Sequence, residues 1–212
     1  MRSQLTLALL SLAALTCGCA NPAANKPKAT VANAQSEPNT AKPAGAEKLV
    51  ISPENSKVEF VAAKVTRSHQ GSFKQFSGTI DFVSNSVEHS RVTIDIDTGS
   101  VVTDENDLTA HLKTADFFDV VKYPKATFVS TKIEPGNGGA TQSVTGNLDL
   151  HGVRKSITFP ATIQVAPDSV AVNAEFAINR KDFGIVYAGK ADDLIRDGVV
   201  IKLTLKVPRT KP

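Results

Sequence analysis

The sequence has no tryptophan, and its only two cysteines, Cys17 and Cys19, lie near the start of the 212 residues. No disulfide framework can therefore stabilise the body of the protein. The 24 Lys and Arg residues and the 21 Asp and Glu residues are scattered, without the basic stripe that polyanion-binding proteins usually have. The composition argues against nucleic acid as a partner and fits a chain with one or two globular domains.

Sequence patterns of common catalytic and metal sites are also missing after residue 19. There is no Gly-x-Ser-x-Gly elbow, no cysteine nucleophile and no glycine-rich phosphate loop. No two of the four histidines are two or four residues apart, so no single helix or strand presents a metal-binding pair. We predict no enzyme, no cofactor and no metal site. A metal-assisted hydrolase that uses His111 and His151 is the alternative from that class.

The start of the chain has the pattern of an export signal. Arg2 supplies a positive charge, and residues 5–15 form a short apolar segment. This segment is too short to cross a hydrocarbon core of about 30 Å as a helix. The small residues before Cys19 resemble the lipobox of bacterial lipoproteins, in which the signal is removed ahead of a cysteine that receives a diacylglyceryl group. We predict a lipoprotein signal peptide over residues 1–18 and a lipid anchor on Cys19. An ordinary cleaved signal is the alternative.

Residues 19–47 are rich in Ala, Pro, Asn and Lys and show no apolar periodicity. Such a segment buries too little apolar surface to offset the entropy of ordering it. We predict a disordered linker that holds a folded domain, residues 48–212, off a membrane. The expected location is the periplasmic, extracytoplasmic side of the cell envelope. Ala20, in place of Asp after the cysteine, favours the outer membrane if the cell is Gram-negative.

Apolar and polar residues alternate along much of the chain after residue 48, which indicates half-buried antiparallel strands. The alternation is regular in residues 92–97, 156–165, 170–179 and 199–207, and weaker in residues 57–66, 73–83, 125–134 and 141–151. Residues 104–115 have a helical pattern instead, with Asp104 or Asp107 as the N-cap. We predict an all-β fold, an eight-stranded antiparallel β-barrel with one short α-helix. A sandwich would also hide the apolar face.

Three motifs resemble the hallmark segments of the YceI-like family. They are residues 111–120 (HLKTADFFDV) with 122–124 (KYP), residues 144–153 (VTGNLDLHGV) and residues 178–185 (INRKDFGI). The resemblance implies a secreted, lipocalin-like barrel that binds an extended isoprenoid or similar lipid in its lumen. It implies no catalytic reaction.

The expected barrel suggests which residues contact such a lipid. An isoprenoid chain offers no hydrogen bonds, so its pocket should be a long apolar tube with a polar end. The predicted lumen residues are Phe60, Phe76, Phe82, Phe128, Leu148, Phe159, Phe176 and Tyr187. The candidates for contact with a phosphate or quinone head group are Arg67, Lys74, Arg154, Arg180 and Lys181.

The polar residues of the first motif have expected structural roles. Asp116 and Asp119 should cap a turn while Phe117 and Phe118 plug one end of the barrel, and His111 should hydrogen-bond between helix and rim. We predict a membrane-tethered carrier or sequestering protein for an isoprenoid-type lipid. A scaffold or interaction module with a filled interior is the alternative, and a homodimer is left open.

Overall fold

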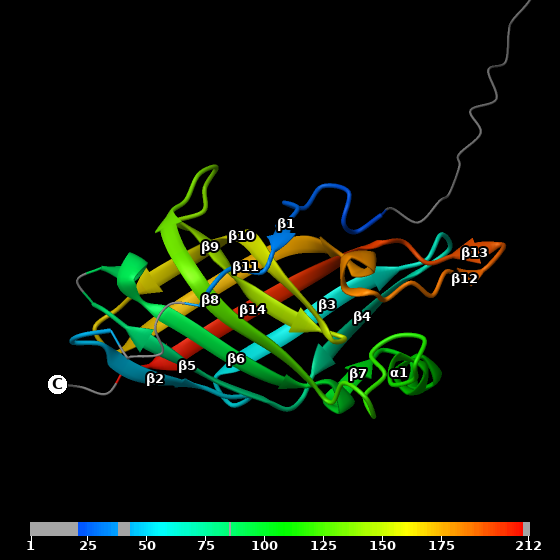
Figure 1. Cartoon of the computed structure of the whole chain (residues 1–212), viewed down its shortest axis with the longest axis horizontal. Coiled ribbons are helices and arrows are strands. Elements are labelled where there is room, and N and C mark those ends of the chain that lie inside the picture. The colour runs from blue at the N-terminus through cyan, green and yellow to red at the C-terminus, as the bar shows by residue number, and fades with distance from the viewer. Residues whose placement is uncertain (1–20, 38–42, 85, 210–212) are drawn as a thin grey trace, which may run out of the picture.

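A computed structural model describes residues 21–37, 43–84 and 86–209 (Figure 1). The predicted signal peptide and Cys19 lie outside these residues. Among the described residues, no helix is long and apolar enough to cross a membrane.

Twelve strands form one strongly curled sheet, a half-barrel, in which the neighbouring strands run antiparallel (Figure 1). Its order is β2-β5-β6-β8-β9-β10-β11-β14-β3-β4-β7, with β1 added to β10, and β12 and β13 form a separate hairpin. The strands are β1 (Thr30–Asn33), β2 (Glu47–Ile51), β3 (Ser56–Ala63), β4 (Ser68–Phe73), β5 (Phe76–Phe82), β6 (Arg91–Asp97), β7 (Val101–Thr103), β8 (Lys125–Pro135), β9 (Gln142–Leu150), β10 (Val153–Val165), β11 (Ser169–Asn179), β12 (Gly189–Lys190), β13 (Asp193–Leu194) and β14 (Gly198–Pro208).

The all-β prediction is confirmed, but the predicted count of eight strands is wrong. Each of the eight predicted segments covers most of one strand of the sheet, namely β3, β5, β6, β8, β9, β10, β11 or β14. The additional strands are short, and β4, with the sequence SHQGSF, has no alternation of apolar and polar residues. Such strands form because a neighbouring strand offers unpaired backbone groups, which their own sequence does not reveal.

One bent ribbon joins the two walls of the half-barrel. The chain passes from β4, which pairs with β3, directly into β5, which pairs with β6. The strands paired with β4 and β5 are β7 and β6, and the chain between them bends at the same place through the 3-10 helix η2 (Thr98–Ser100). Asp97 N donates to the carbonyl of Gln75 at 3.0 Å, and Lys74 N donates to the carbonyl of Ser100 at 3.2 Å. The corner thus keeps its backbone hydrogen bonds while the strands change walls.

The segment predicted to be a disordered linker contains part of the wall. The strand β10 pairs with β11 only through residues 162–165, so the two strands separate toward residue 155. β1 pairs with β10 in this gap. Ala29 N donates to the carbonyl of Ala177 at 2.9 Å, and Ala177 N donates to that of Pro27 at 2.8 Å. The structure corrects the prediction here because the gap supplies backbone partners that compensate for the low hydrophobicity of the segment.

The predicted helix is present in shortened form as α1 (Asn106–Leu112). Its N-cap is Glu105, whose side chain makes no capping hydrogen bond, so the prediction of Asp104 or Asp107 as the N-cap is wrong. Asp104 instead contacts Nδ1 of His69 at 3.0 Å. The buried side chain of Leu112 holds α1 against one end of the half-barrel.

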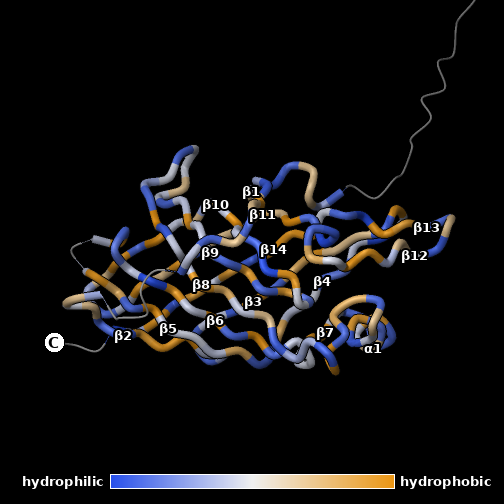
Figure 2. The backbone as a smooth tube through the Cα atoms, viewed as in Figure 1, coloured by the Kyte–Doolittle hydropathy of each residue, from blue (hydrophilic) through white to orange (hydrophobic). Residues whose placement is uncertain are grey.

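The strand alternation places one apolar face inside the curl, and hydrophobic and hydrophilic residues alternate along the strands in Figure 2. The two ends of the interior differ. At one end Leu49, Ile51, Phe82 and Val207 are almost completely buried in a packed cluster, which closes the interior. The other end, here called the mouth end, carries α1, the 3-10 helix η3 (Arg180–Phe183) and the hairpin of β12 and β13.

Candidate functional site

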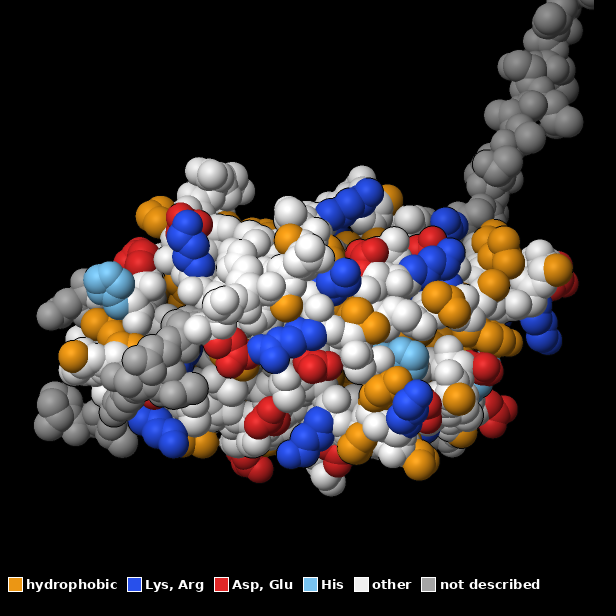
Figure 3. All heavy atoms as spheres, in the orientation of Figure 1, with side chains coloured by type: hydrophobic (Ala, Val, Ile, Leu, Met, Phe, Trp, Pro, Cys, Tyr) orange, Lys and Arg blue, Asp and Glu red, His pale blue; other side chains and the backbone are white. Residues whose placement is uncertain are grey.

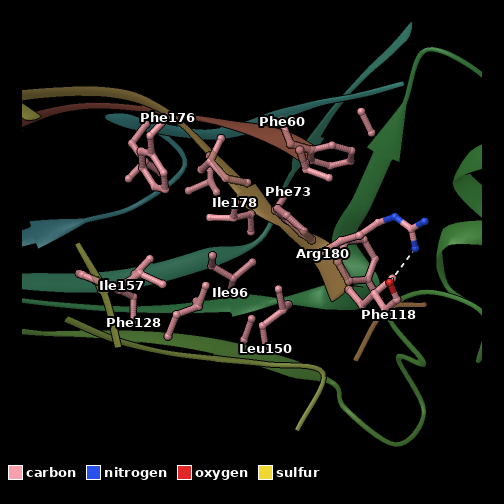
Figure 4. Close-up of a pocket in the computed structure, with 18 of the residues that line it drawn as sticks. Phe60, Phe73, Ile96, Phe118, Phe128, Leu150, Ile157, Phe176, Ile178 and Arg180 are labelled. Carbon is pink, nitrogen blue, oxygen red and sulfur yellow. Dashed lines mark hydrogen bonds between the residues drawn. The ribbon is translucent and has the colours of Figure 1, made fainter. Parts of the chain in front are cut away.

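A cavity of about 180 Å³ lies inside the half-barrel between the packed cluster and the mouth end (Figure 4). Every side chain that lines it is apolar except Arg180. The walls contribute Val58, Phe60, Ala62, Phe73, Ile94, Ile96, Ala126, Phe128, Leu148, Leu150, Ile157, Phe159, Phe176, Ile178, Val199, Ile201 and Leu203. The mouth end contributes Leu112, Phe117, Phe118, Arg180, Ile185 and Ile195. The arrangement suits an apolar molecule that enters past the mouth end, because the packed cluster blocks the other end.

Five of the eight predicted lumen residues line the cavity: Phe60, Phe128, Leu148, Phe159 and Phe176. The other three do not. Phe76 and Phe82 face inward but belong to the packed cluster at the closed end. Tyr187 lies at the mouth end, where its ring meets those of His111 and Phe117 edge to face at 5.2 and 5.4 Å between centroids. The alternation of apolar and polar residues shows which side chains face the interior. It does not show how far along the barrel axis each of them lies.

Seven of the residues that line the cavity are phenylalanines. Phe159 and Phe176 are stacked, with 4.2 Å between ring centroids, and Phe128 lies 5.7 Å from Phe159. Toward the mouth end, Phe73 lies between Phe60 at 5.9 Å and Phe118 at 5.6 Å. Rigid rings with few rotatable bonds offer a large apolar contact area at a small entropic cost. Sequence reasoning missed Phe73 as a lumen residue because it is out of phase with Phe76 in the predicted strand 73–83, whereas the structure places it at the end of the separate strand β4.

Two glycines make room for these rings. On β4, Gly71 lies opposite Phe60 of β3, and a Cβ atom there would overlap the ring of Phe60. On β9, a Cβ atom at Gly146 would overlap the ring of Phe128. Large and small residues on neighbouring strands therefore compensate each other along the cavity wall, and the rings stay close to the wall.

The loop after α1 closes the mouth end from one side. Phe117 and Phe118 from this loop line the cavity, which agrees with the prediction that they plug one end. Asp119 has a positive φ of 44°, and its N–H bonds to the carbonyl of Thr114 at 2.8 Å. Nε2 of His111 lies 2.8 Å from Oδ2 of Asp116, which connects α1 to the loop. These contacts hold the two Phe rings against the cavity.

The second motif forms the turn between β9 and β10 at the same end. His151 and Gly152 both have positive φ, 55° and 72°, as a two-residue type I′ turn requires. Nδ1 of His151 lies 3.3 Å from the carbonyl oxygen of Phe183, and its ring packs against Tyr123. The described residues contain no group of three His, Cys, Asp or Glu side chains that could hold a metal ion.

Arg180 is the polar group closest to the cavity, and Figure 4 shows it at the mouth end beside Phe118. Its side chain is almost completely buried. Nη1 donates to the carbonyl of Ile185 at 2.6 Å, Nε to that of Arg196 at 3.2 Å and Nη2 to that of Ile195 at 3.3 Å. Burial lowers the pKa of the guanidinium, and the nearby Asp197 carboxylate partly offsets this effect. The guanidinium nevertheless stays charged, because its ordinary pKa is far above neutral pH.

The other head-group candidates lie away from the cavity. Arg67 is paired with Glu105, and Arg154 is paired with Glu37, in both cases at the surface. Lys181 is half-exposed and lies 3.0 Å from Asp197. Lys74 lines a separate, polar groove on β3, β4 and β7. Of the five predicted cations, only Arg180 lines the cavity.

Residues 49–207 match the family model of the YceI-like domain. Similar proteins include a UPF0312 protein of Pseudomonas putida (strain W619), which is 39% identical over 121 residues, and one of Pseudomonas fluorescens (strain SBW25), which is 33% identical over 131 residues. The first alignment covers 54% of this chain and 62% of the relative, and the second covers 59% and 68%. The chain thus spans less than two thirds of the length of the Pseudomonas putida relative.

Solved structures share the fold. Burkholderia cenocepacia BcnA is 28% identical with a TM-score of 0.64, covering 71% of this chain and 95% of its own. A Campylobacter jejuni YceI protein is 28% identical with a TM-score of 0.56, covering 66% and 85%. A polyisoprenoid binding domain from Saccharophagus degradans is 19% identical with a TM-score of 0.62, covering 78% and 99%, and this likeness concerns the fold alone.

Proposed function

Because this chain belongs to the YceI-like domain family, we propose that it binds an extended, isoprenoid-type lipid in the cavity of its half-barrel and does not act as an enzyme. The main support is the lining of the cavity, in which Arg180 is the sole polar residue among more than twenty apolar ones. An isoprenoid chain has no hydrogen-bonding group along its length, so a lining of this kind satisfies it completely. Each methylene moved from water into the cavity contributes about 0.8 kcal/mol.

The size of the cavity sets a condition on this proposal. A cavity of roughly 150 Å³ holds a molecule the size of benzene, and pockets for larger ligands measure about 300–1,000 Å³. At about 180 Å³, the cavity accommodates only a short part of a long chain without rearrangement. A longer ligand therefore requires the mouth-end loop with Phe117 and Phe118 to move outward, which extends the cavity toward the surface.

The position of Arg180 supports placing the head group at the mouth end. The apolar tail would then point toward the packed cluster, and a phosphate or quinone oxygen would lie near the guanidinium. The alternative, a scaffold with a filled interior, is supported by the packed cluster itself, which fills the other end of the half-barrel. The two functions differ in whether apolar molecules occupy the remaining cavity.

The cellular setting is part of the proposal. A lipid anchor on Cys19 would place the protein on the periplasmic side of the cell envelope, where it would carry or sequester the lipid. The sequence before Cys19 supports this location. Mass spectrometry of the protein purified from a membrane fraction tests it: the expected N-terminal peptide begins at an acylated Cys19, and a peptide that retains residues 1–18 contradicts it.

Lipid occupancy can be tested directly. Protein expressed in several bacterial hosts is extracted with organic solvent, and the extract is analysed by mass spectrometry. The empty protein is then offered a long-chain ubiquinone and a polyprenyl phosphate. We expect one bound lipid per chain. Preparations that contain no lipid from any host and bind neither compound would contradict the proposal and favour the scaffold.

A pair of matched substitutions separates binding in the cavity from binding elsewhere. Ala62 lines the cavity, whereas Ala171 of β11 lies on the opposite, outer face between the inward-facing Val170 and Val172. We expect Ala62→Phe to reduce lipid binding at least tenfold because its ring occupies the lumen, and Ala171→Phe to leave binding unchanged. Equal effects of the two substitutions would contradict a binding site in the lumen.

A further inference from the structure

The mouth end exposes an unusual number of apolar side chains. Of the six large hydrophobic residues that are exposed in the described part of the chain, four lie here: Val65, Val121, Val186 and Leu194. Val121 is 93% exposed and follows the loop that bears Phe117 and Phe118. Figure 3 shows hydrophobic side chains gathered at this end of the molecule. A cluster of this kind at the entrance of an apolar cavity indicates a contact surface.

These residues, here called the apolar rim, come from three segments of the mouth end. The N–H of Val65 donates to the carbonyl of Leu194 at 3.1 Å, which joins the β3–β4 turn to the β12–β13 hairpin. Val186 lies between Ile185, which lines the cavity, and Tyr187, whose ring contacts Phe117. Ile195, which follows Leu194, also lines the cavity, so Val186 and Leu194 both adjoin the lining.

The N-terminal segment starts at the same end. Ala23 is buried against Ala177 and Val200 on the outer face of the wall and lies beside Gly198, the first residue of β14. Gly198 follows closely after Ile195, which lines the cavity at the mouth end. The blue segment in Figure 1 accordingly runs toward the β12–β13 hairpin. Cys19 is two residues before Asn21, so an extended chain places it within about 7 Å of that residue.

We propose that the mouth end docks on the surface of a lipid bilayer, with the apolar rim inserted at the boundary between head groups and acyl chains. The inference rests on the proposed lipid-binding function and extends it with the place of lipid exchange. An anchor on Cys19 would hold the rim at the membrane, because a short tether gives an effective concentration in the millimolar range. A lipid would then pass between bilayer and cavity without crossing water.

The charges around the rim indicate what kind of bilayer it fits. Lys64 is paired with Asp193 at 2.6 Å, Arg67 with Glu105, and Lys181 with Asp197 at 3.0 Å. Polybasic segments bind anionic lipids because their cations are not neutralised by neighbouring acids. Here the neighbouring acids neutralise these three cations. Two further cations belong to this end: Lys122, next to Val121, lies over the ring of Tyr123, and Lys190 is part of β12. Docking should therefore depend mainly on apolar contact, with anionic lipid as a minor contribution.

The absence of tryptophan from the chain allows a sharp test. Protein that begins at Cys19 contains all the residues that the structure describes, and Cys19 is its one thiol. This thiol is coupled to a maleimide phospholipid in neutral phosphatidylcholine vesicles, which replaces the proposed natural anchor. Single reporters are introduced at the rim, Val186→Trp or Leu194→Trp, and at exposed sites on the rest of the surface, Val50→Trp or Val165→Trp. Brominated phosphatidylcholine then quenches any reporter that reaches the acyl chains.

We expect the rim reporters to be quenched at least twofold with a blue-shifted emission, and the other reporters to keep their emission. Equal quenching of both sets, or quenching of neither, would overturn the proposal. A requirement for phosphatidylglycerol would overturn the neutral mode of docking. Circular dichroism confirms that each variant is folded. The lipid content of the cavity, measured on uncoupled protein in solution, shows separately whether the proposed binding function holds.

A further variant separates insertion of the rim from proximity due to the tether. With Leu194→Trp as the reporter, the double substitution Val121→Ser and Val186→Ser removes two exposed apolar side chains that line no part of the cavity. We expect it to reduce quenching by half or more. Unchanged quenching would mean that the tether alone brings the reporter to the bilayer, and the proposal would be wrong.

Discussion

Nη1 of Arg180 donates a 2.6 Å hydrogen bond to the carbonyl oxygen of Ile185, and both residues line the mouth end of the cavity. The same guanidinium reaches the carbonyls of Ile195 and Arg196. The buried side chain of Arg180 thus holds two segments in place. The segment with Ile185 follows η3, and the segment with Ile195 and Arg196 precedes β14. Its geometry suggests that Arg180 shapes the cavity entrance as well as supplying a positive charge there.

We expect Arg180→Lys to lower the free energy of unfolding by about 2–4 kcal/mol. A lysine ammonium cannot reproduce the planar fork of donors, so buried carbonyls lose their partners. Urea unfolding followed by circular dichroism measures the change. Lys181→Met is the matched control, because Lys181 contacts the same Asp197 from the surface and should contribute less than about 1 kcal/mol. Similar losses in both variants would show that Arg180 has no special structural role.

A second prediction concerns the glycines under the aromatic rings. In Gly71→Ala the new methyl group meets the far end of the Phe60 side chain, which can turn into the cavity. We expect this variant to stay folded but to bind a long-chain ubiquinone severalfold more weakly. In Gly146→Ala the Cβ also lies 2.6 Å from the carbonyl oxygen of Val129, which cannot move without the strand. Its unfolding free energy should fall by about 1–3 kcal/mol.

Thermal unfolding and ubiquinone titrations on both glycine variants check this pair. The prediction is contradicted if Gly71→Ala binds as well as the unchanged protein, because the ring would then have moved elsewhere. It is also contradicted if Gly146→Ala is as stable as Gly71→Ala.

Much of the wall of the cavity was predictable from the sequence. The alternation around Ile94 and Ile96 on β6, and around Phe159 and Phe176 on β10 and β11, identified residues that do face the interior. The motif with Phe117 and Phe118 correctly indicated a plug at one end. These features depend on local periodicity and on short motifs, which a single sequence contains.

Other features depend on distant parts of the chain. Phe82 and Phe128 have the same inward orientation, but the first is packed against Leu49 and Val207 while the second lines the cavity. The sequence of β1 is too polar to predict a strand, and it forms one because β10 and β11 separate at that point. Register along the barrel axis and gaps between strands arise only after the sheet has formed.

The N-terminal segment provides a third prediction. Asn147 of β9 is almost completely buried, and its amide makes two hydrogen bonds to the backbone of Gln35: Oδ1 accepts from N at 2.9 Å and Nδ2 donates to O at 2.8 Å. Asn147→Asp replaces the donor by an oxygen that faces a carbonyl oxygen. We expect the unfolding free energy to fall by about 2–3 kcal/mol and proteolysis to occur first near residue 35.

Thr131→Val is the control for this substitution. Its hydroxyl also contacts Gln35, at 3.0 Å from Oε1, but at the surface. We expect a change below about 1 kcal/mol, since water replaces the lost partner. If Asn147→Asp and Thr131→Val had the same stability and the same cleavage pattern, residues 27–37 would not be anchored through Asn147.

The last prediction concerns pH. Nζ of Lys26 contacts Oε2 of Glu175 at 2.8 Å and so connects the N-terminal segment to β11. The hydrogen bond from Lys26 lowers the pKa of Glu175 below its ordinary value of 4.5, and the charge of Lys202 acts in the same direction. Because the carboxylate form is favoured in the folded state, the contact stabilises the segment above pH 4.5. This contribution is lost as the pH falls through the lowered pKa of Glu175.

Both side chains of this ion pair are more than one third exposed, so the effect should be about 0.5 kcal/mol or less. Amide protection factors of Ala29 and Ala177, corrected for intrinsic exchange, should decrease between pH 6 and pH 3. In Glu175→Gln, protection should already be reduced at pH 6 and should change less with pH, because the titrating group is gone. A decrease of the same size in Glu175→Gln would assign the pH dependence to another group. The segment between Asn21 and β1 would then be held to the wall mainly by its backbone hydrogen bonds to Ala177, which do not titrate.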